Sequence, residues 1–261
     1  MNKSETSTVK SKKTVFLYRE ENKKLFYQDL AVQFKAFGLA VTDKQLEDFA
    51  TYYELLIRTN ETLNLTAITE PHEVAVKHMV DSLSCYHSDI FIDGLKVLDL
   101  GTGAGFPGIP LAIYNRNLHI VLFDSLNKRL QFLKTVIDTL DLKNVTILHG
   151  RAEDLSHDAM HREQYDIVTS RAVARLPILA EWCIPYVKKE GYFVALKGAA
   201  YEEEIKEGHH ALQLLGAELA KIKPVALPTL ADKRAILYIK KIGVTPPIYP
   251  RKPKNIKERP L

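Results

Sequence analysis

Three glycines stand at alternate positions in the sequence VLDLGTGAGFPGIP, residues 97–110, directly after a short apolar run. This run has the composition of a buried β-strand, and Gly101, Gly103 and Gly105 would form the turn into the next helix. Glycines in such a turn let the backbone approach a ligand, because no Cβ atom intervenes. Ligands of doubly wound sheets bind at this turn. The stretch therefore predicts a nucleotide-type site; a tight turn without a ligand is the alternative.

The residues around this turn narrow the choice of ligand. Phe106 stands where a dinucleotide fingerprint would place its third glycine, and the turn lacks the Gly-Lys-Ser or Gly-Lys-Thr of a phosphate-binding loop. Asp99 lies just before the glycines, and Asp124 follows them by about 20 residues, where a carboxylate accepts hydrogen bonds from a ribose diol. A ligand with adenosine and a ribose diol but no phosphate is S-adenosylmethionine.

The sequence RAEDL, residues 151–155, follows the third expected strand and contains acidic residues that could contact the adenine end of such a ligand. An acid here accepts a hydrogen bond from the adenine amino group, with the backbone of Ala152 and Glu153 along the edge of the base. The alternative is that Asp154 caps the N-terminus of a helix. We expect Glu153 to contact the ligand.

The sequence YDIVTSRAVAR, residues 165–175, would form the fourth strand and bring Ser170, Arg171 and Arg175 beside the glycine turn. Enzymes that methylate exocyclic amino groups carry Asp or Asn here, followed by Pro-Pro and an aromatic residue, whereas this chain has arginine. A different acceptor is the ring nitrogen N7 of guanine, which has a free lone pair. Its methylation needs alignment of N7 with the methyl group rather than a general base. Arg171 would hold the methionine carboxylate or donate to guanine O6, or else pair with a surface acid.

Further candidates come from other segments. His78 and Asp81 share one helix face, so His78 would close the pocket or guide RNA, or pair with Asp81 for stability. Trp182, the only tryptophan, sits in the apolar sequence ILAEWCIPYV, which favours the core over a base-stacking role. Basic residues that would contact RNA, or simply be solvated, are Arg175 after the fourth strand, Lys197 at the end of the fifth strand, and Lys128, Arg129 and Lys134 on one helix.

A sheet is needed to bring these residues together, and the apolar pattern predicts one. Apolar residues recur at helical spacing over residues 23–60, with a break at Gly38 and a capping box at Thr42 and Gln45. A second helical stretch, HEVAVKHMVDSLSCY, follows Pro71. From Lys96 onward, β-branched runs alternate with helical stretches, which predicts an α/β fold with a parallel sheet covered on both faces. The expected strands are KVLDL, HIVLFD, VTILHG, YDIVTSR, GYFVALKG, AELAKIKPVAL and RAILYIKKI, the last two forming an antiparallel pair at one edge.

The composition is typical of a soluble globular chain, with 261 residues, 46% hydrophobic and 26% charged. No apolar run approaches the ~20 residues that a membrane span needs. The first 16 residues lack the apolar core of a secretory signal, so we expect a cytoplasmic protein without membrane contact. Cys85 and Cys183 match neither a disulfide framework nor a zinc pattern, and no metal site is expected.

The positive charge is concentrated at the two ends of the chain. Residues 1–13 carry a net charge of +3 and residues 249–261 carry +4, so the rest is acidic within a total of +4. Such ends would clamp RNA, with Arg251 and Lys252 as contacts, or would only keep the protein soluble. The expected organisation is a basic, flexible tail over 1–22, a helical region over 23–92, a Rossmann-like domain over 93–243 and a basic, Pro-rich tail over 244–261.

Seven short sequences, in order, resemble a bacterial family once called glucose-inhibited division protein B, a family of small-subunit ribosomal RNA methyltransferases. They are NLTAIT (64–69), KHMVDSL (77–83), LDLGTGAGFPGIPLAI (98–113), DSLNKRLQFL (124–133), RAEDL (151–155), SRAVA (170–174) and LKG (196–198). The similarity runs from about Leu25 to the end and includes the sequence YPRKP. Seven ordered matches are far more specific than the glycine turn alone.

The resemblance implies an S-adenosylmethionine-dependent methyltransferase fold, with a mostly parallel seven-stranded sheet and an N-terminal helical appendage. It also implies transfer of a methyl group from S-adenosylmethionine to N7 of a guanine of 16S rRNA, at position 527 in the 530 loop. The partner would be 16S rRNA or the small ribosomal subunit, and we expect a monomer. By resemblance the cofactor contacts are Gly101, Phe106, Ala152, Glu153 and Arg171, with Asp124, Ser125 and Leu126 as additions.

Two other functions stay open on the sequence. The first is a non-catalytic RNA-binding or ribosome-binding factor with a vestigial pocket, which the loss of Gly103, Asp124 or Arg171 would have favoured; all three are present. The second is a methyltransferase that acts on a protein or a small molecule. The basic ends and the missing amino-methylation motif argue against it.

Overall fold

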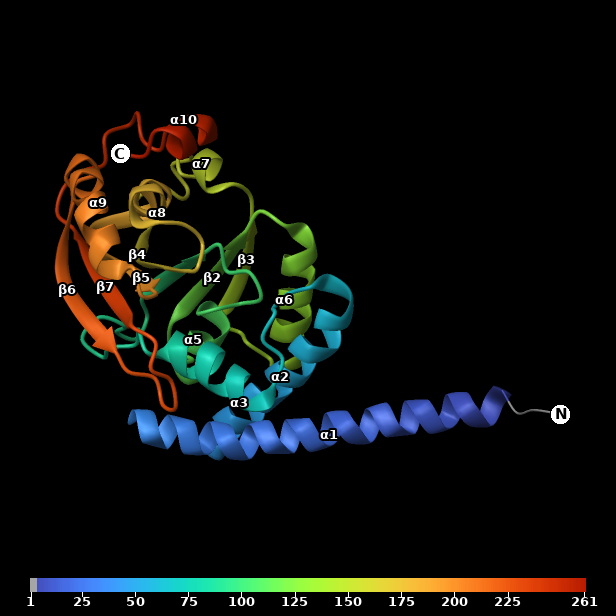
Figure 1. Ribbon diagram of the computed structural model, residues 1–261. Helices are drawn as coiled ribbons and strands as arrows, with labels where there is room; N and C mark the ends of the chain where they lie inside the picture. The colour runs from blue at the N-terminus through green and yellow to red at the C-terminus, as the bar shows by residue number, and fades with distance from the viewer. Residues whose placement is uncertain (1–3) are drawn as a thin grey trace.

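The centre of the molecule is a seven-stranded sheet with the strand order β3-β2-β1-β4-β5-β7-β6 (Figure 1). The computed structural model describes residues 4–261, with side chains from residue 20 onward. Strands β1 to β5 are parallel, and β7 pairs antiparallel with both β5 and β6. The strands are β1 Lys96–Leu100, β2 His119–Asp124, β3 Val145–His149, β4 Tyr165–Arg171, β5 Val187–Lys197, β6 Ala217–Val225 and β7 Arg234–Lys241.

The predicted strands and their pairing are confirmed. β1, β2 and β4 have the expected bounds, whereas β5 begins at Val187, four residues before the expected sequence. The chain direction switches at β1, because β2 pairs on one side of it and β4 on the other. The carboxyl ends of β1 and β4 therefore meet at the place where such sheets bind ligands.

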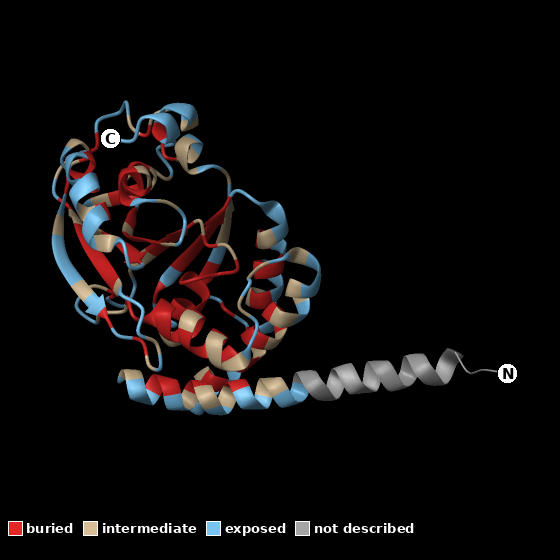
Figure 2. Ribbon diagram, in the orientation of Figure 1, coloured by how far each residue is buried: buried red, intermediate tan, exposed pale blue. Residues whose placement is uncertain are grey.

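Helices cover both faces of the sheet, and two apolar clusters fill the space beneath them (Figure 2). One cluster joins the sheet to α5 (Gly108–Tyr114), α6 (Asn127–Thr139) and the N-terminal helices. The other joins the opposite face to α8 (Leu176–Cys183) and α9 (Tyr201–Leu214). Because Phe26 and Val97 belong to the same cluster, the N-terminal helices share a core with the sheet rather than forming one of their own.

The N-terminal region consists of α1 (Ser4–Phe37) and α2 (Asp43–Leu63). The expected break at Gly38 and the Thr42/Gln45 capping box are confirmed. The tail expected over residues 1–22 is wrong from Ser4 onward, because α1 passes through residue 22 without interruption; residues 1–3 lie outside the described part. The sequence of α1 has no glycine or proline to end the helix earlier.

The stretch after Pro71 is helical as expected, but its middle is wider than an α-helix. Short α-helical pieces, α3 (Pro71–Val74) and α4 (Asp81–Leu83), flank η1, a π-helical segment over Ala75–Val80. Single π-helical turns inside α-helices are frequently found at functional sites. This segment packs beside the cavity described below.

The C-terminal segment, residues 244–261, is folded against the body rather than being the tail that its prolines and lysines suggested. It contains α10 (Pro253–Glu258), whose Ile256 is fully buried. Arg251 makes an ion pair of 2.7 Å with Glu181, which is completely buried on α8. A buried carboxylate such as Glu181 needs a positively charged partner, and this ion pair holds residues 244–261 against the surface of the domain. The remaining short helices are α7 (Ala152–Leu155) and η2 (Ile184–Tyr186).

Within the described residues, no helix is both long and apolar enough to cross a membrane. Among the same residues, no group of three or more His, Cys, Asp or Glu side chains is arranged to hold a metal ion. Cys85 and Cys183 are both free and buried.

Candidate active site

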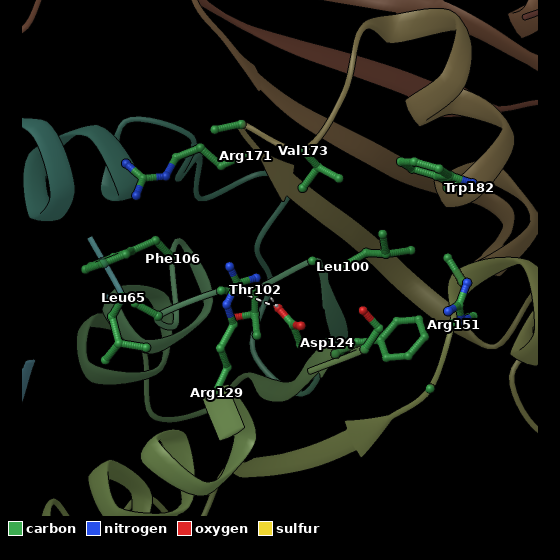
Figure 3. A pocket seen from close by; sticks show the side chains of 18 of the residues that line it. Leu65, Leu100, Thr102, Phe106, Asp124, Arg129, Arg151, Arg171, Val173 and Trp182 are labelled. Carbon is green, nitrogen blue, oxygen red and sulfur yellow. Dashed lines mark hydrogen bonds and ion pairs between the residues drawn. The ribbon is translucent and has the colours of Figure 1, made fainter. Parts of the chain in front are cut away.

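A cavity of about 580 Å³ opens at the carboxyl ends of β1, β2 and β4, where the direction of the chain switches (Figure 3). The sequence prediction of a ligand site at the glycine turn coincides with this cavity. The predicted cofactor residues that line it are Gly101, Gly103, Phe106, Asp124, Ser125, Ala152, Glu153 and Arg171.

The glycine turn keeps the floor of the cavity free of side chains. Gly101 has a φ of +74°, and a Cβ atom added there would lie 2.7 Å from Cγ2 of Val173, across the cavity wall. Gly103 has a φ of +60°. Both angles favour glycine, so this turn keeps its shape only with these residue types.

Asp99 supports the turn from below instead of facing a ligand. Its Oδ2 atom accepts hydrogen bonds from Thr102 Oγ1 at 2.6 Å and from the Gly108 N–H at 2.8 Å, and Thr169 Oγ1 lies 3.3 Å from its Oδ1 atom. The side chain is completely buried, and burial raises its pKa to about 6. The sequence had grouped Asp99 with the ligand-binding acids, and this placement corrects that view.

Asp124, unlike Asp99, is among the residues that line the cavity. It accepts hydrogen bonds from the Gly103 N–H at 3.0 Å and from the Leu126 N–H at 2.9 Å, and Arg129 Nη1 lies 3.4 Å from its Oδ2 atom. These donors fix the orientation of the carboxylate at the end of β2. The position fits the predicted contact with a ribose diol.

Two predicted cofactor residues do not line the cavity. A Cβ atom at Gly105 would meet Ile109, Leu133 and the Tyr52 hydroxyl at 2.7–2.9 Å, so this glycine faces the core. The Leu126 side chain is 51% exposed and only its backbone N–H reaches Asp124. Gly105 and Leu126 therefore lie outside the lining of the cavity, and their contacts with the cofactor stay a prediction.

Arg171 is partly buried at the edge of the cavity and is held by the π-helical segment η1 and by the start of α4. Its Nη1 atom donates to the Lys77 carbonyl at 2.9 Å and to Asp81 Oδ2 at 2.8 Å, and its Nη2 atom lies 3.2 Å from His78 Nδ1. These contacts use three of the five N–H groups of a guanidinium. The partner acid that the sequence alternative placed at the surface is in fact buried, since Asp81 is 5% exposed.

His78 packs flat on Phe106, with ring centroids 4.4 Å apart, and the Arg171 guanidinium lies 4.9 Å from the centre of the same Phe106 ring. Burial first, and then the nearby charge of Arg171, lower the pKa of His78 to about 3, so the imidazole is neutral. We assign the proton to Nε2, which then donates to Thr66 Oγ1 at 2.8 Å while Nδ1 accepts from Arg171. His78 thus lines the cavity without pairing with Asp81.

The far end of the cavity is formed by residues beyond β3 and by α8. Ala152 and Glu153 lie in the first turn of α7, whose N-cap is Arg151, so Asp154 does not cap the helix. Trp182 packs partly against the core, as its apolar sequence favours, and it also lines the cavity. In Figure 3, Trp182 and Arg151 lie on one side of Asp124, and Arg171 and Phe106 lie on the other.

Several of the predicted RNA contacts are already engaged within the protein. Arg175 binds Glu207 at 2.8 Å, and Lys197 binds Glu204 at 2.6 Å and the Ala174 carbonyl at 2.7 Å. Arg251 is bound to Glu181, and His78 is buried. The residues that keep an exposed or partly exposed cationic head are Lys128, Lys134, Lys252 and, at the cavity, Arg129.

Several cavity residues were not singled out as sites from the sequence. Leu65 and Thr66 lie within the sequence NLTAIT, which gave a family signal but no local chemical one. Arg151 and Lys257 also line the cavity, and Lys257 comes from α10. No spacing rule connects these positions to the glycine turn, so only the fold brings them there.

Comparisons with known proteins agree on one family. The model of the GidB family, described as rRNA small subunit methyltransferase G, matches residues 45–234. A protein of Clostridium botulinum named ribosomal RNA small subunit methyltransferase G is 45% identical over 236 residues, 90% of this chain and 99% of its own length. One of Lactobacillus helveticus with the same name is 46% identical over 226 residues, 86% and 94% of the two chains.

Among solved structures, a more distant likeness is to Aeropyrum pernix fibrillarin with natively bound S-adenosyl-L-methionine, at 18% identity, a TM-score of 0.47, and 61% and 73% coverage of the two chains. The sequence relatives are far closer and span nearly the whole chain. With the family model matching most of the sequence, the chain belongs to the rRNA small subunit methyltransferase G family.

Proposed function

We propose that this protein transfers a methyl group from S-adenosylmethionine to N7 of a guanine in the 530 loop of 16S rRNA. Family membership supports an S-adenosylmethionine-dependent rRNA methyltransferase. The observation that carries the choice of atom is the chemistry at the end of β4, where the cavity is bordered by Arg171 and not by a free oxygen acceptor. An exocyclic amino group would need such acceptors, whereas N7 does not.

The residues of the cavity divide into a ribose and adenine side and a methyl side. The carboxylates that line it are Asp124, at the end of β2, and Glu153, on α7 after β3. The Ser170 hydroxyl beside Arg171 donates to the Leu100 carbonyl at 2.9 Å, and Ser170 is fully buried and does not line the cavity. When bound, S-adenosylmethionine supplies an electrophilic methyl group. The neutral His78 imidazole, whose pKa is about 3, has its two ring nitrogens engaged by Thr66 and Arg171, so the methyl side offers position and shape without a group suited to removing a proton.

Charge at the methyl side is nearly balanced, which suits this transfer. The attack of N7 turns a sulfonium into a neutral thioether and gives the purine a positive charge. A lone guanidinium would oppose that charge, but Arg171 is paired with Asp81 at 2.8 Å. Asp81 is shared with Arg234 at 3.2 Å, and Arg234 has a second partner in Asp232 at 3.6 Å, so two carboxylates face the two guanidinium groups. Arg171 can then donate hydrogen bonds from its remaining N–H groups without a net positive charge, and the aligned geometry lowers the barrier.

The RNA would approach over three cations at or beside the mouth of the cavity. Arg151 and Lys257 line it, and Lys128 is exposed on α6 beside it. None of the three has an ion-pair partner among the residues whose side chains are described, so all are free for phosphate contacts. We expect the protein to act as a monomer in the cytoplasm, where the small ribosomal subunit is found.

The test is methyl transfer from radiolabelled S-adenosylmethionine to deproteinised 16S rRNA and to intact small subunits, both from a strain that lacks this gene. Mass spectrometry then maps the modified nucleotide. We expect label at guanine N7 in the 530 loop, abolished by Asp124→Ala and retained by Arg175→Ala, whose side chain is bound to Glu207 outside the cavity. Cofactor binding without label on either substrate would contradict the proposed acceptor and favour a protein or small-molecule acceptor.

A further inference from the structure

The C-terminal clamp, which we define as residues 244–261, reaches the cavity from the far end of the sheet. Its helix α10 lies beside α7 and α8 (Figure 1). Ile256 on α10 is fully buried, and the next residue, Lys257, lines the cavity. A segment that follows the last strand of the sheet therefore supplies part of the wall of the site.

The clamp is attached to α8 by one strong ion pair. Arg251 donates from Nε to Glu181 Oε1 at 2.9 Å and from Nη2 to Glu181 Oε2 at 2.7 Å, and its backbone N–H donates to Oε1 at 2.7 Å. The same Nη2 atom donates to the Arg259 carbonyl at 3.0 Å, just beyond α10. Because Glu181 is 0% exposed, this two-pronged pairing fixes the clamp tightly.

Residues that follow β3 hold the clamp from a second direction. Arg162 donates to the Tyr249 and Thr245 carbonyls, each at 2.9 Å, and His157 Nε2 lies 3.0 Å from the Pro250 carbonyl. This stretch begins with Ala152 and Glu153, the residues expected at the adenine. The clamp is thus tied both to α8 and to the stretch after β3 that lines the adenine end.

Trp182 links the ion pair to the cavity. It directly follows Glu181 on α8 and lines the cavity on the side of Arg151, opposite Arg171 and Phe106 (Figure 3). Its Nε1 atom is buried and has no hydrogen-bond partner among the described residues. The position of the indole is therefore set by packing. The Glu181–Arg251 pair constrains that packing, because Glu181 is the residue directly before Trp182 on α8.

We propose that the C-terminal clamp completes the adenine end of the cofactor cavity, with Arg251 and Glu181 as positioning residues for Trp182 and for α10 with its Lys257. The proposal rests on S-adenosylmethionine being the cofactor, as in the proposed function. Neither Arg251 nor Glu181 lines the cavity itself, so both act through these neighbours.

The first test needs no variant, because Trp182 is the only tryptophan in the chain. Intrinsic fluorescence of the wild-type protein is titrated with S-adenosylhomocysteine, adenosine and methionine, while calorimetry measures binding. We expect S-adenosylhomocysteine and adenosine to change the emission of Trp182, and methionine to leave it unchanged. Calorimetric binding of S-adenosylhomocysteine with silent Trp182 emission would overturn the proposal and leave the proposed function standing.

The second test separates positioning from chemistry. In Arg251→Ala we expect the Kd of S-adenosylhomocysteine and the KM of S-adenosylmethionine to rise on the order of tenfold, the value of one lost side-chain contact, with kcat nearly unchanged. Arg251→Lys, which keeps the charge opposite Glu181, should restore part of the affinity. The matched control is Lys254→Ala, an exposed residue of α10 without a side-chain partner among the described residues.

A failure of the proposed function and a failure of the clamp proposal give different results in these experiments. A wild-type protein that does not bind S-adenosylhomocysteine in the calorimeter would refute the proposed function as well. Normal binding by a folded Arg251→Ala variant, checked by circular dichroism, would refute the clamp alone. If that variant does not fold, the fluorescence titration of the wild-type protein decides.

Discussion

Arg171 at the end of β4 and Asp81 at the start of α4 are 90 residues apart in the chain, and their side chains form an ion pair of 2.8 Å. The pair is largely buried, with 14% and 7% of the two side chains exposed. It joins the N-terminal helices to the strand that borders the methyl side of the cavity. Asp81 also pairs with Arg234 at 3.2 Å, so it keeps a partner if Arg171 is changed.

Arg171→Lys tests this relationship. A lysine retains a charge for Asp81 but loses the simultaneous contacts with the Lys77 carbonyl and His78, so the edge of the cavity shifts. We expect methyl transfer to fall by about 100-fold with the fold intact, measured as kcat and KM and by circular dichroism. Arg175→Lys, four residues on and paired at the surface, is the matched control and should stay near the wild-type rate. Equal activities of the two variants would contradict the assignment.

Asp124→Asn tests the ribose contact. Asn has the same shape but accepts weaker hydrogen bonds, and its amide group opposes the N–H donors of Gly103 and Leu126. Losing one charge-assisted hydrogen bond of about 1.5–3 kcal/mol should raise the Kd of S-adenosylhomocysteine by about 10- to 100-fold. Isothermal titration calorimetry measures the change. An unaltered Kd would mean that Asp124 only shapes the turn.

Gly101→Ala tests whether the floor of the cavity must be free of side chains. The new methyl group would lie 2.7 Å from Val173 Cγ2, so cofactor binding should weaken strongly. Gly94→Ala is the matched control, because Gly94 also has a positive φ, +84°, but no atom within 4 Å of an added Cβ. Both variants should lose about 1 kcal/mol of stability from the left-handed backbone, and only Gly101→Ala should lose cofactor affinity. Similar calorimetric Kd values for the two would refute this reading.

Asp99 should give the protein a pH-dependent stability. Burial raises its pKa from 3.8 to about 6, so between these values the folded state binds the proton more tightly than the unfolded state does. The free energy of unfolding must therefore fall as the pH rises from about 4 to about 6, by about 3 kcal/mol from this group. Urea unfolding of the wild type and of Asp99→Asn, which cannot titrate, should give curves that converge or cross over this pH range. Parallel curves would show that the buried carboxyl does not titrate there.

Local sequence patterns predicted the strands and helices of the sheet domain and, within the cavity, the glycine turn and Asp124. The β-branched runs placed β1, β2 and β4 within their observed bounds, and Thr42 with Gln45 marked the start of α2. The glycines and Asp124 were found because the turn and the acid lie on consecutive βα units, whose carboxyl ends meet in any parallel sheet. These features depend on hydrogen bonds and side-chain periods over a few residues, which the sequence displays directly.

The tertiary structure alone decided how distant residues share the same cavity. The Asp99 side chain is buried because Thr102 and Gly108 donate hydrogen bonds to it there. Arg171 pairs with Asp81, which follows the π-helical segment. Arg251 pairs with Glu181, 70 residues earlier in the chain. Trp182 and Lys257 line the cavity, although the sequence pattern around Trp182 indicated the core and that around Lys257 indicated a tail. A buried charge must find a partner wherever the fold brings one, and no spacing along the chain encodes which partner that is.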